Sequence, residues 1–209
     1  MEPDDNDSTP RHGISDELTT FVWETIKVIL LSLAIILPIR YYLVQPFFVK
    51  GQSMESNFQD KDYILVDKLG YRLTPPQRGD VIVFRYPLQP SEYFIKRIIG
   101  LPGETVEVKN NKVIISNSNN PQGFVLDEKW YLDSFQETRG ALRVQLGDTE
   151  YFVLGDNRLH SSDSRIWGPL DISFISGRAW LRLWPLNQIL HIPRITYPSP
   201  LSWLGIWAY

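Results

Sequence analysis

The chain has 209 residues, of which 43% are hydrophobic and 13% aromatic, so it holds enough apolar material for one globular domain with an appendage. Its formal net charge of -3 argues against a nucleic-acid-binding protein, because a phosphate backbone is held mainly by clustered lysine and arginine side chains. The absence of cysteine excludes disulfides and thiolate chemistry.

The N-terminal region changes character at Phe21. Residues 1–20 are polar and acidic, which predicts a flexible tail. The apolar run that follows extends to Ile39, but only residues 28–39 are free of charge, whereas a bilayer core requires about 20 apolar residues. By length alone, a buried helix of a soluble protein fits this run as well as a membrane span does.

Aromatic residues at the ends of this run favour the membrane. Trp23 lies near its start, and Tyr41 and Tyr42 follow its end, as in the aromatic belts of membrane segments. No basic region precedes the run and no small-x-small cleavage site follows it, which disfavours a cleaved secretory signal. We therefore predict a persistent membrane anchor at residues 21–44, whose orientation the flanking charges do not specify.

From Asp62 onward, short segments rich in β-branched and aromatic residues alternate with glycine, proline and asparagine. This pattern predicts a mostly β fold, a folded or barrel-like antiparallel sheet within a domain at residues 45–195. Residues 116–140 are predicted to form an excursion between two halves of the sheet, and residues 196–209 an apolar C-terminal segment. The predicted strands lie in residues 62–69, 79–87, 93–99, 104–109, 112–116, 150–155 and 177–185, with a hairpin turn at Asn110-Asn111.

Three stretches carry residues capable of chemistry: VKGQSME at 49–55, YFIKRIIGLPGE at 93–104 and LGDNRLHSSDSRIWGPL at 154–170. Their order and separation resemble the bacterial type I signal peptidases, also called leader peptidases, from the anchor to about residue 185. The resemblance implies a serine endopeptidase that removes N-terminal signal peptides from exported precursor proteins. It implies neither a metal nor another cofactor.

By this resemblance, Ser53 is the nucleophile and Lys96 the general base. A hydroxyl is a poor nucleophile until a neighbouring base takes its proton, so such a partner is required. Alternation along a strand would place Lys96 on the same face as Phe94 and Ile98, with Arg97 on the other. Apolar neighbours disfavour the charged ammonium and so favour the neutral amine that a base requires.

The third stretch supplies supporting residues by the same resemblance: Ser161, Asp163 and Arg165. Ser161 would orient the lysine amine, and Asp163 paired with Arg165 would stiffen the wall behind the dyad. His160 adjoins Ser161, so a serine–histidine pair remains an alternative. The pair Asp156-Asn157 fits a turn held by its own side chains as well as it fits a direct catalytic part.

The loop around Ser53 departs from the family in two ways. Gly51 stands where some relatives carry a serine that donates to the oxyanion, so the oxyanion hole would rest on the backbone N–H of Ser53, with Gly51 nearby. After Ser-Met the family usually continues x-Pro-Thr-Leu, whereas residues 55–58 here read Glu-Ser-Asn-Phe. Without the proline, the loop that carries Ser53 is less restrained.

The resemblance also implies partners and a location. The protein would be a single-pass protein of the cell membrane, with its serine protease domain on the extracytoplasmic side. Its partners would be the lipid bilayer and the signal peptides of preproteins, with small residues at the cleavage site, but no nucleic acid. One alternative is a catalytically impaired relative that binds precursors without cleaving them. A self-cleaving repressor is disfavoured, because a tail and an apolar segment precede Ser53 in place of a DNA-binding module.

Overall fold

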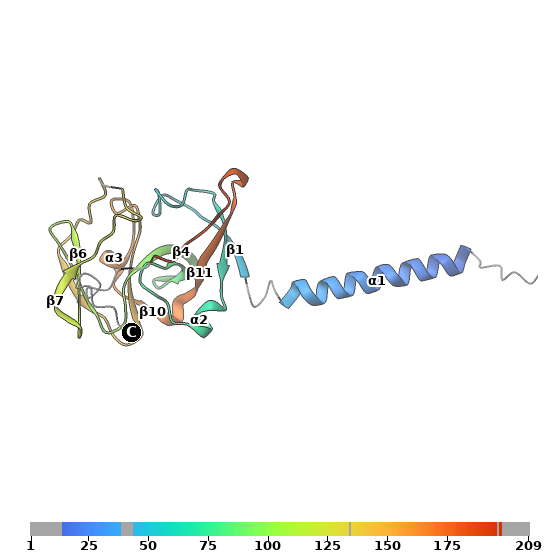
Figure 1. Ribbon diagram of the computed structural model, residues 1–209, viewed down its shortest axis with the longest axis horizontal. Helices are drawn as coiled ribbons and strands as arrows, with labels where there is room; N and C mark the ends of the chain where they lie inside the picture. Colours follow the sequence, from blue (N-terminus) through green and yellow to red (C-terminus); the bar gives the residue numbers. More distant parts are fainter. Residues whose placement is uncertain (1–13, 39–43, 134, 196, 198–209) are drawn as a thin grey trace, which may run out of the picture. The chain divides into compact units, whose positions relative to one another are not determined.

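The computed structural model describes residues 14–38, 44–133, 135–195 and 197 (Figure 1). The chain divides into two units, residues 1–42 and residues 43–209. Most of the predicted tail and nearly all of the predicted C-terminal segment lie outside the described residues.

The N-terminal unit contains one long helix, α1 (Ile14–Pro38). Its stretch Glu17–Pro38 has 22 residues with a mean hydropathy of 2.0, which is long and apolar enough to cross a bilayer. The helix begins at Ile14, so residues 14–20 are helical although the sequence placed them in the tail. An acidic residue such as Glu17 suits the first turns of a helix, because the N–H groups there carry partial positive charge.

The charges within the apolar stretch of α1 compensate each other. Lys27 Nζ lies 2.6 Å from Glu24 Oε1, one helical turn away, and 6.0 Å from the centre of the Trp23 ring. A pair at this spacing needs no distortion of the helix. The stretch therefore carries no net charge from these two residues, which lowers the cost of placing it in a membrane.

The larger sheet of the second unit contains eight antiparallel strands in the order β1-β2-β11-β3-β4-β9-β10, with β12 pairing β11. The strand β1 forms one edge, and β3 and β4 lie in the interior. The bounds are β1 (Val44–Phe48), β2 (Tyr63–Asp67), β3 (Val81–Tyr86), β4 (Gln89–Gly100), β9 (Glu150–Leu154), β10 (Leu170–Asp171), β11 (Ile175–Trp184) and β12 (Leu190–His191).

A second antiparallel sheet has the order β7-β6-β5-β8, formed by β5 (Thr105–Lys109), β6 (Lys112–Asn117), β7 (Asn120–Val125) and β8 (Leu142–Gln145). Asn110 and Asn111 connect β5 to β6 with φ of 52° and 60°, the positive values that a tight hairpin turn requires. The predicted excursion at 116–140 contributes β7 to this sheet. The mostly antiparallel β fold is thus confirmed, but the described strands form two sheets and no closed barrel.

Short helical turns connect several strands. They are α2 (Gly70–Leu73), α3 (Ser164–Trp167), η2 (Ile172–Phe174) and η3 (Leu186–Gln188). All are three or four residues long, in keeping with the absence of a long helical pattern after residue 50.

Both faces of the larger sheet are covered at its centre. Val81 and Val83 of β3 belong to a buried apolar cluster with Met54, whereas the alternate residues Ile82 and Phe84 belong to another cluster with Ile98. A third cluster joins the second sheet to the end of β9. A strand that is covered on both faces has a continuously apolar sequence, such as VIVF in β3. Residues 81–84 of β3 and 95–100 of β4 are therefore buried, whereas the first residues of β4 are exposed.

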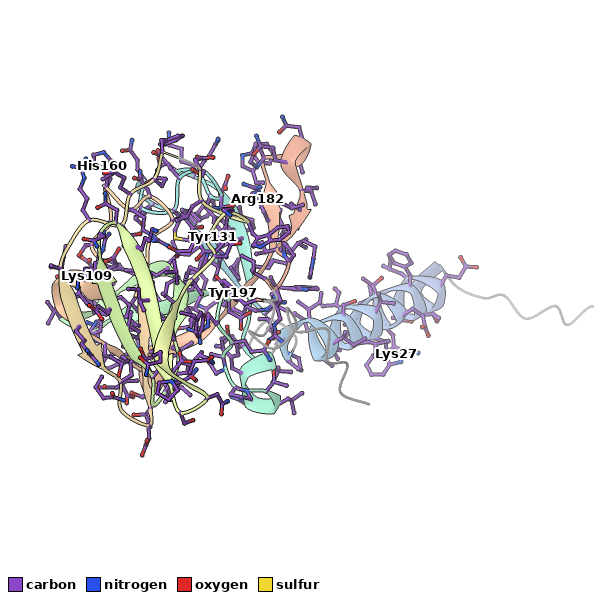
Figure 2. The ribbon with its side chains drawn as sticks, turned by 60° about the vertical axis from the view of Figure 1, so that its left-hand side comes forward. Lys27, Lys109, Tyr131, His160, Arg182 and Tyr197 are labelled. Atoms are coloured by element: carbon purple, nitrogen blue, oxygen red, sulfur yellow. The ribbon has the colours of Figure 1, made fainter. Side chains whose placement is uncertain are left out.

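Residues from the end of the described chain also enter this core. The Tyr197 hydroxyl donates to the Tyr131 hydroxyl at 3.1 Å, and both side chains lie within the β-rich unit in Figure 2. Burial raises the pKa of Tyr197 to about 12, so its hydroxyl remains protonated at neutral pH. Tyr131 lies in the predicted excursion, which is therefore packed into the domain.

Candidate active site

Ser53 lies in the loop that connects β1 to β2. The loop is closed at its base, where the Val49 N–H donates to the Asp62 carbonyl at 2.9 Å. Met54 and Phe58 are 1% and 3% exposed, so two side chains next to Ser53 anchor the loop in the core. This apolar anchoring fixes the backbone on the C-terminal side of Ser53, whose own side chain is half-buried.

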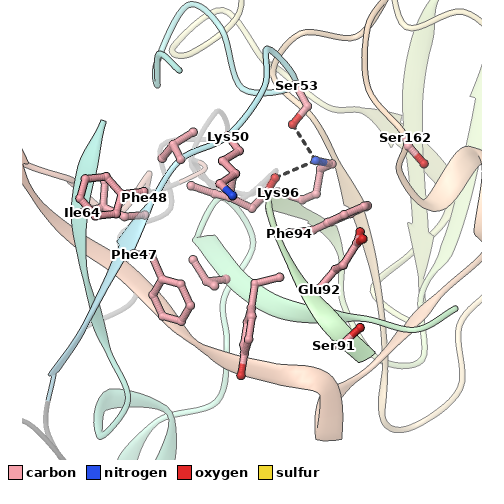
Figure 3. Close-up of a pocket in the computed structure, with 14 residues that line it drawn as sticks. Phe47, Phe48, Lys50, Ser53, Ile64, Ser91, Glu92, Phe94, Lys96 and Ser162 are labelled. Carbon is pink, nitrogen blue, oxygen red and sulfur yellow. Dashed lines mark hydrogen bonds between the residues drawn. The ribbon is translucent and has the colours of Figure 1, made fainter. Parts of the chain in front are cut away.

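Lys96 lies on β4, opposite Ile82 of β3, and is only 3% exposed. Its Nζ is 2.7 Å from Ser53 Oγ and 2.8 Å from the carbonyl oxygen of Ile95 (Figure 3). The amine also lies 5.3 Å from the centre of the Phe94 ring. Burial lowers the pKa of Lys96 to about 8, although the negative charges of Asp163 and Asp156 act in the opposite direction.

The next residue on β4 points to a different environment. Arg97 donates through Nε to Asp156 Oδ1 at 2.8 Å and through Nη2 to Asp156 Oδ2 at 2.6 Å. The two side chains are 5% and 0% exposed, and the Arg97 guanidinium lies 4.2 Å from the Tyr131 ring. A two-pronged ion pair of this kind keeps both charges satisfied away from water. It binds the strand of Lys96 to the segment that follows β9.

That segment also holds the backbone of Ser53. The Asn157 N–H donates to the Ser53 carbonyl at 3.1 Å. Between β9 and this bond, Gly155 faces the Ser53 carbonyl oxygen and Ser161 Oγ so closely that an added Cβ would overlap both atoms. Gly155 is therefore needed for the close approach of two backbone segments, since any side chain would push the Ser53 loop away.

The remaining predicted residues lie behind this contact. Asp163 accepts from the Gly155 N–H at 3.1 Å and from Arg165 Nε at 2.8 Å, and it caps the first turn of α3. Arg165 Nη2 in turn donates to the Arg158 carbonyl at 2.7 Å. Ser161 Oγ is buried and has no hydrogen-bond partner among the described residues. The structure thus brings Ser161 beside Gly155, but it holds no hydrogen bond between Ser161 and Lys96.

A cleft of about 670 Å³ opens in front of Ser53 and Lys96. It lies between the end of β1 and the outer half of β4, and Figure 3 shows aromatic side chains along both sides. Its walls are mostly apolar, so it suits a chain with apolar side chains. The lining residues are Phe47, Phe48, Val49, Lys50, Ser53, Ile64, Val83, Ser91, Glu92, Tyr93, Phe94, Ile95, Lys96 and Ser162.

Comparison with known proteins adds a family to this geometry. A family model described as signal peptidase, peptidase S26, matches residues 22–184. The chain belongs to the signal peptidase family. It is 37% identical over 175 residues to a probable signal peptidase I-1 of Synechocystis sp., covering 80% of this chain and 85% of the relative. It is 38% identical over 174 residues to a signal peptidase I of Leptolyngbya laminosa, covering 79% of this chain and 81% of the relative.

A solved signal peptidase I from Enterococcus faecalis V583 aligns with 50% of this chain and 97% of its own chain. The identity is 31% and the TM-score 0.41. The signal peptidase family predicted from the three sequence motifs is thus confirmed by the family model and by the curated relatives.

The two departures from the usual signal peptidase sequence have a structural context. Gly51 has φ of 83°, a conformation that disfavours any side chain, and its N–H donates to Asp60 Oδ1 at 2.8 Å. The Ser53 N–H has no hydrogen-bond partner within the described part of the chain, so it is available as a donor. Residues 55–58 form a turn in which the Phe58 N–H donates to the Met54 carbonyl at 2.8 Å.

The structure shows no serine–histidine pair at Ser161 and His160, because Ser161 Oγ has no hydrogen-bond partner among the described residues. The His160 side chain is exposed and lines a separate hollow with Arg139 and Ser161, and it is absent from the cleft that holds Ser53 and Lys96. Figure 2 shows it at the periphery of the β-rich unit.

Sequence reasoning left several contributors to this signal peptidase site unassigned. The sequence leaves two roles possible for Asp156, either in a turn held by its own side chains or directly in catalysis. It assigns no role to Tyr131 or Asn57. These residues contact each other and Arg97 across 34 or more residues of the chain, so no local pattern in the sequence indicates the contacts. The one available signal was the occurrence of Asp156 within a recognised motif.

Proposed function

We propose that the protein is a membrane-bound serine endopeptidase that removes signal peptides from exported precursors, with Ser53 as nucleophile and Lys96 as general base. The observation that carries this proposal is the 2.7 Å separation of Ser53 Oγ and the buried Lys96 Nζ, whose pKa is lowered to about 8. Membership of the signal peptidase family supports the class of substrate.

The reaction would begin when neutral Lys96 takes the Ser53 proton as Oγ attacks the scissile carbonyl. The Ser53 N–H would stabilise the oxyanion, and the Lys96 ammonium would then protonate the leaving amine. The Ile95 carbonyl at 2.8 Å and the charges of Asp163 and Asp156 favour this transient ammonium. Neutral Lys96 would next deprotonate a water molecule, which hydrolyses the acyl-enzyme ester and restores Ser53.

The substrate would bind as an extended strand. The strand β1 is the edge of the larger sheet, so its outer N–H and C=O groups can pair with an added chain. Apolar side chains from residues 47–49 and 93–95 line the cleft beside Ser53. We infer that this cleft takes small residues at the first and third positions before the cut.

The part of α1 from residue 21 onward would serve as the membrane anchor predicted at residues 21–44, and residues 45–195 would form the protease domain. Its length and hydropathy support this role, as does the internal pairing of Glu24 with Lys27. We propose that the protease domain lies on the extracytoplasmic side of the cell membrane, where the signal peptides of emerging precursors become accessible.

The proposal predicts cleavage of a precursor with an Ala-x-Ala site by the full chain in detergent. Cutting is expected immediately after the second alanine, and replacing that alanine with phenylalanine should lower the rate at least about 100-fold if the site prefers a small residue there, as inferred above. Gel analysis and mass spectrometry of the new N-terminus measure both results. If several precursors bind but none is cut, the non-cleaving alternative is correct.

A pH dependence follows from the lowered pKa of Lys96. Only the neutral amine can accept the Ser53 proton, so kcat/KM should rise about tenfold per pH unit below about pH 8 and level off above it. Because the folded pKa lies below the ordinary 10.5, the unfolded chain binds more protons between about pH 8 and 10.5, and stability should increase with pH across that window. Measurements of peptide cleavage and of thermal unfolding from about pH 6 to 10 test the predicted changes in kcat/KM and in stability. An inflection of kcat/KM near pH 6.5 would instead indicate a histidine base.

A further inference from the structure

The side chain of Asn57 ties the loop that carries Ser53 to two distant segments of the chain. Its Nδ2 lies 2.8 Å from Asp156 Oδ2 and 2.8 Å from the carbonyl oxygen of Tyr131. An amide nitrogen carries two hydrogens, so both are used. The two acceptors lie 99 and 74 residues further along the chain, so Asn57 joins three separate segments at one point.

The Asp156 carboxylate that accepts from Asn57 is the partner of Arg97, the neighbour of Lys96 on β4. Asp156 is completely buried, so its carboxylate oxygens have no access to water. Water therefore cannot replace the protein groups that donate hydrogen bonds to them. A rigid chain of contacts therefore runs from Asn57 through Asp156 and Arg97 to the strand that carries Lys96.

On the other side, Asn57 is coupled to Ser53 by a single turn of backbone. The N–H groups of Asn57 and Phe58 both donate to the Met54 carbonyl, at 3.1 Å and 2.8 Å. The Asn57 carbonyl accepts from Arg182 Nη1 at 3.2 Å, which fixes the turn from outside. A shift of Asn57 is thus transmitted through Met54 to the adjacent Ser53.

We propose that Asn57 is a positioning residue that holds Ser53 against Lys96 by tying the Ser53 loop to Asp156 and to the Tyr131 carbonyl. Asn57 does not line the cleft, so it acts on the alignment of the two reacting groups and leaves substrate binding alone. This inference rests on the proposed roles of Ser53 and Lys96.

The test compares Asn57→Ala with a matched control, Asn117→Ala. Asn117, in β6 of the second sheet, donates through Nδ2 to Glu104 Oε1 at 3.0 Å, and Glu104 is paired with Arg78. The control therefore also removes an amide from a largely buried arginine–carboxylate pair, but one that contains neither Arg97 nor Asp156. For Asn57→Ala we expect kcat to fall between about 10- and 100-fold with KM within about twofold of wild type. Asn117→Ala should keep the wild-type kcat.

A second measurement does not require activity. Nuclear magnetic resonance of labelled lysine gives the pKa of Lys96, which should rise towards 10.5 in Asn57→Ala, because the amine then loses Ser53 as a partner and gains water. Asn117→Ala should leave it near 8. If the wild-type protein cleaves no precursor but the Lys96 pKa still rises in Asn57→Ala, the proposed function is rejected and the positioning role of Asn57 is retained.

The variant Asn57→Thr keeps one side-chain hydrogen-bond donor. It replaces Asn57→Ala in both measurements if the alanine variant does not fold. Its kcat is expected about fivefold below wild type, since a hydroxyl can donate to only one of the two acceptors. The inference is overturned if the folded Asn57 variants keep both kcat and the Lys96 pKa of wild type, or if Asn117→Ala causes the same losses.

Discussion

Cleavage is expected to fall by at least about 10⁴-fold in kcat when either Ser53 or Lys96 is replaced by alanine, because the proposed mechanism requires the two residues to act as one unit. The double variant should be no slower than either single variant, since the second change removes nothing that the first has left in place. Lys96→Arg should be equally inactive, because a guanidinium does not lose its proton in a protein.

Precursor cleavage and thermal unfolding of the purified full chain measure these variants together. Lys109→Ala is a suitable control, because Lys109 is exposed at the end of β5 in the second sheet and should retain wild-type activity. Folded Ser53→Ala that still cuts at the same bond would rule out Ser53 as the nucleophile. An active Lys96→Arg would exclude proton abstraction by residue 96.

The second large effect is expected at Gly155, where the structure leaves no space for a Cβ. Alanine there would overlap the Ser53 carbonyl oxygen and Ser161 Oγ, and the first of these is backbone that cannot rotate away. We expect Gly155→Ala to cost about 2–3 kcal/mol of folding stability through overpacking. A displacement of Ser53 by about 1 Å from Lys96 would lower kcat roughly 100-fold in addition.

Gly147→Ala provides the comparison for this variant. An added Cβ at Gly147 meets the end of the Glu150 side chain at 3.3 Å, and that flexible group can move aside. Thermal unfolding and cleavage should therefore remain close to wild type in Gly147→Ala and fall in Gly155→Ala. Equal behaviour of the two variants would show that the Ser53 loop yields more easily than its contacts indicate.

The strands that the sequence predicted are those with dense β-branched and aromatic residues, and each of the seven predicted segments overlaps an observed strand. The missed strands lie at sheet edges and break this pattern. The strand β1 contains Pro46, and β7 contains Pro121 and Gly123, residues that weaken a strand prediction but are tolerated where one side of the strand is unpaired. Pattern alone cannot identify such edges, because tertiary pairing and not local preference makes them strands.

The candidate site divides in the same way. Ser53 and Lys96 were placed together through motifs of a known family, and the described contacts bring their side chains within 2.7 Å. The roles assigned to them stay predictions until the variants are measured. Asn57 and Tyr131 were not found, because their contacts with Asp156 and Arg97 depend on how distant segments fold and leave no periodic signal in the sequence.

The wide separation of the joined residues has a consequence for the timing of activity. Ser53 meets Lys96 across 43 residues, and Asn57 meets Asp156 across 99 residues. Contacts between residues so far apart in the sequence form late in folding, because the entropy cost of closing a long loop must be met before the contact adds stability. If Ser53 and Lys96 are the nucleophile and base proposed above, a chain that is still being synthesised cannot align them fully until Asp156 has emerged. Proteolytic activity is then expected only once the fold is complete.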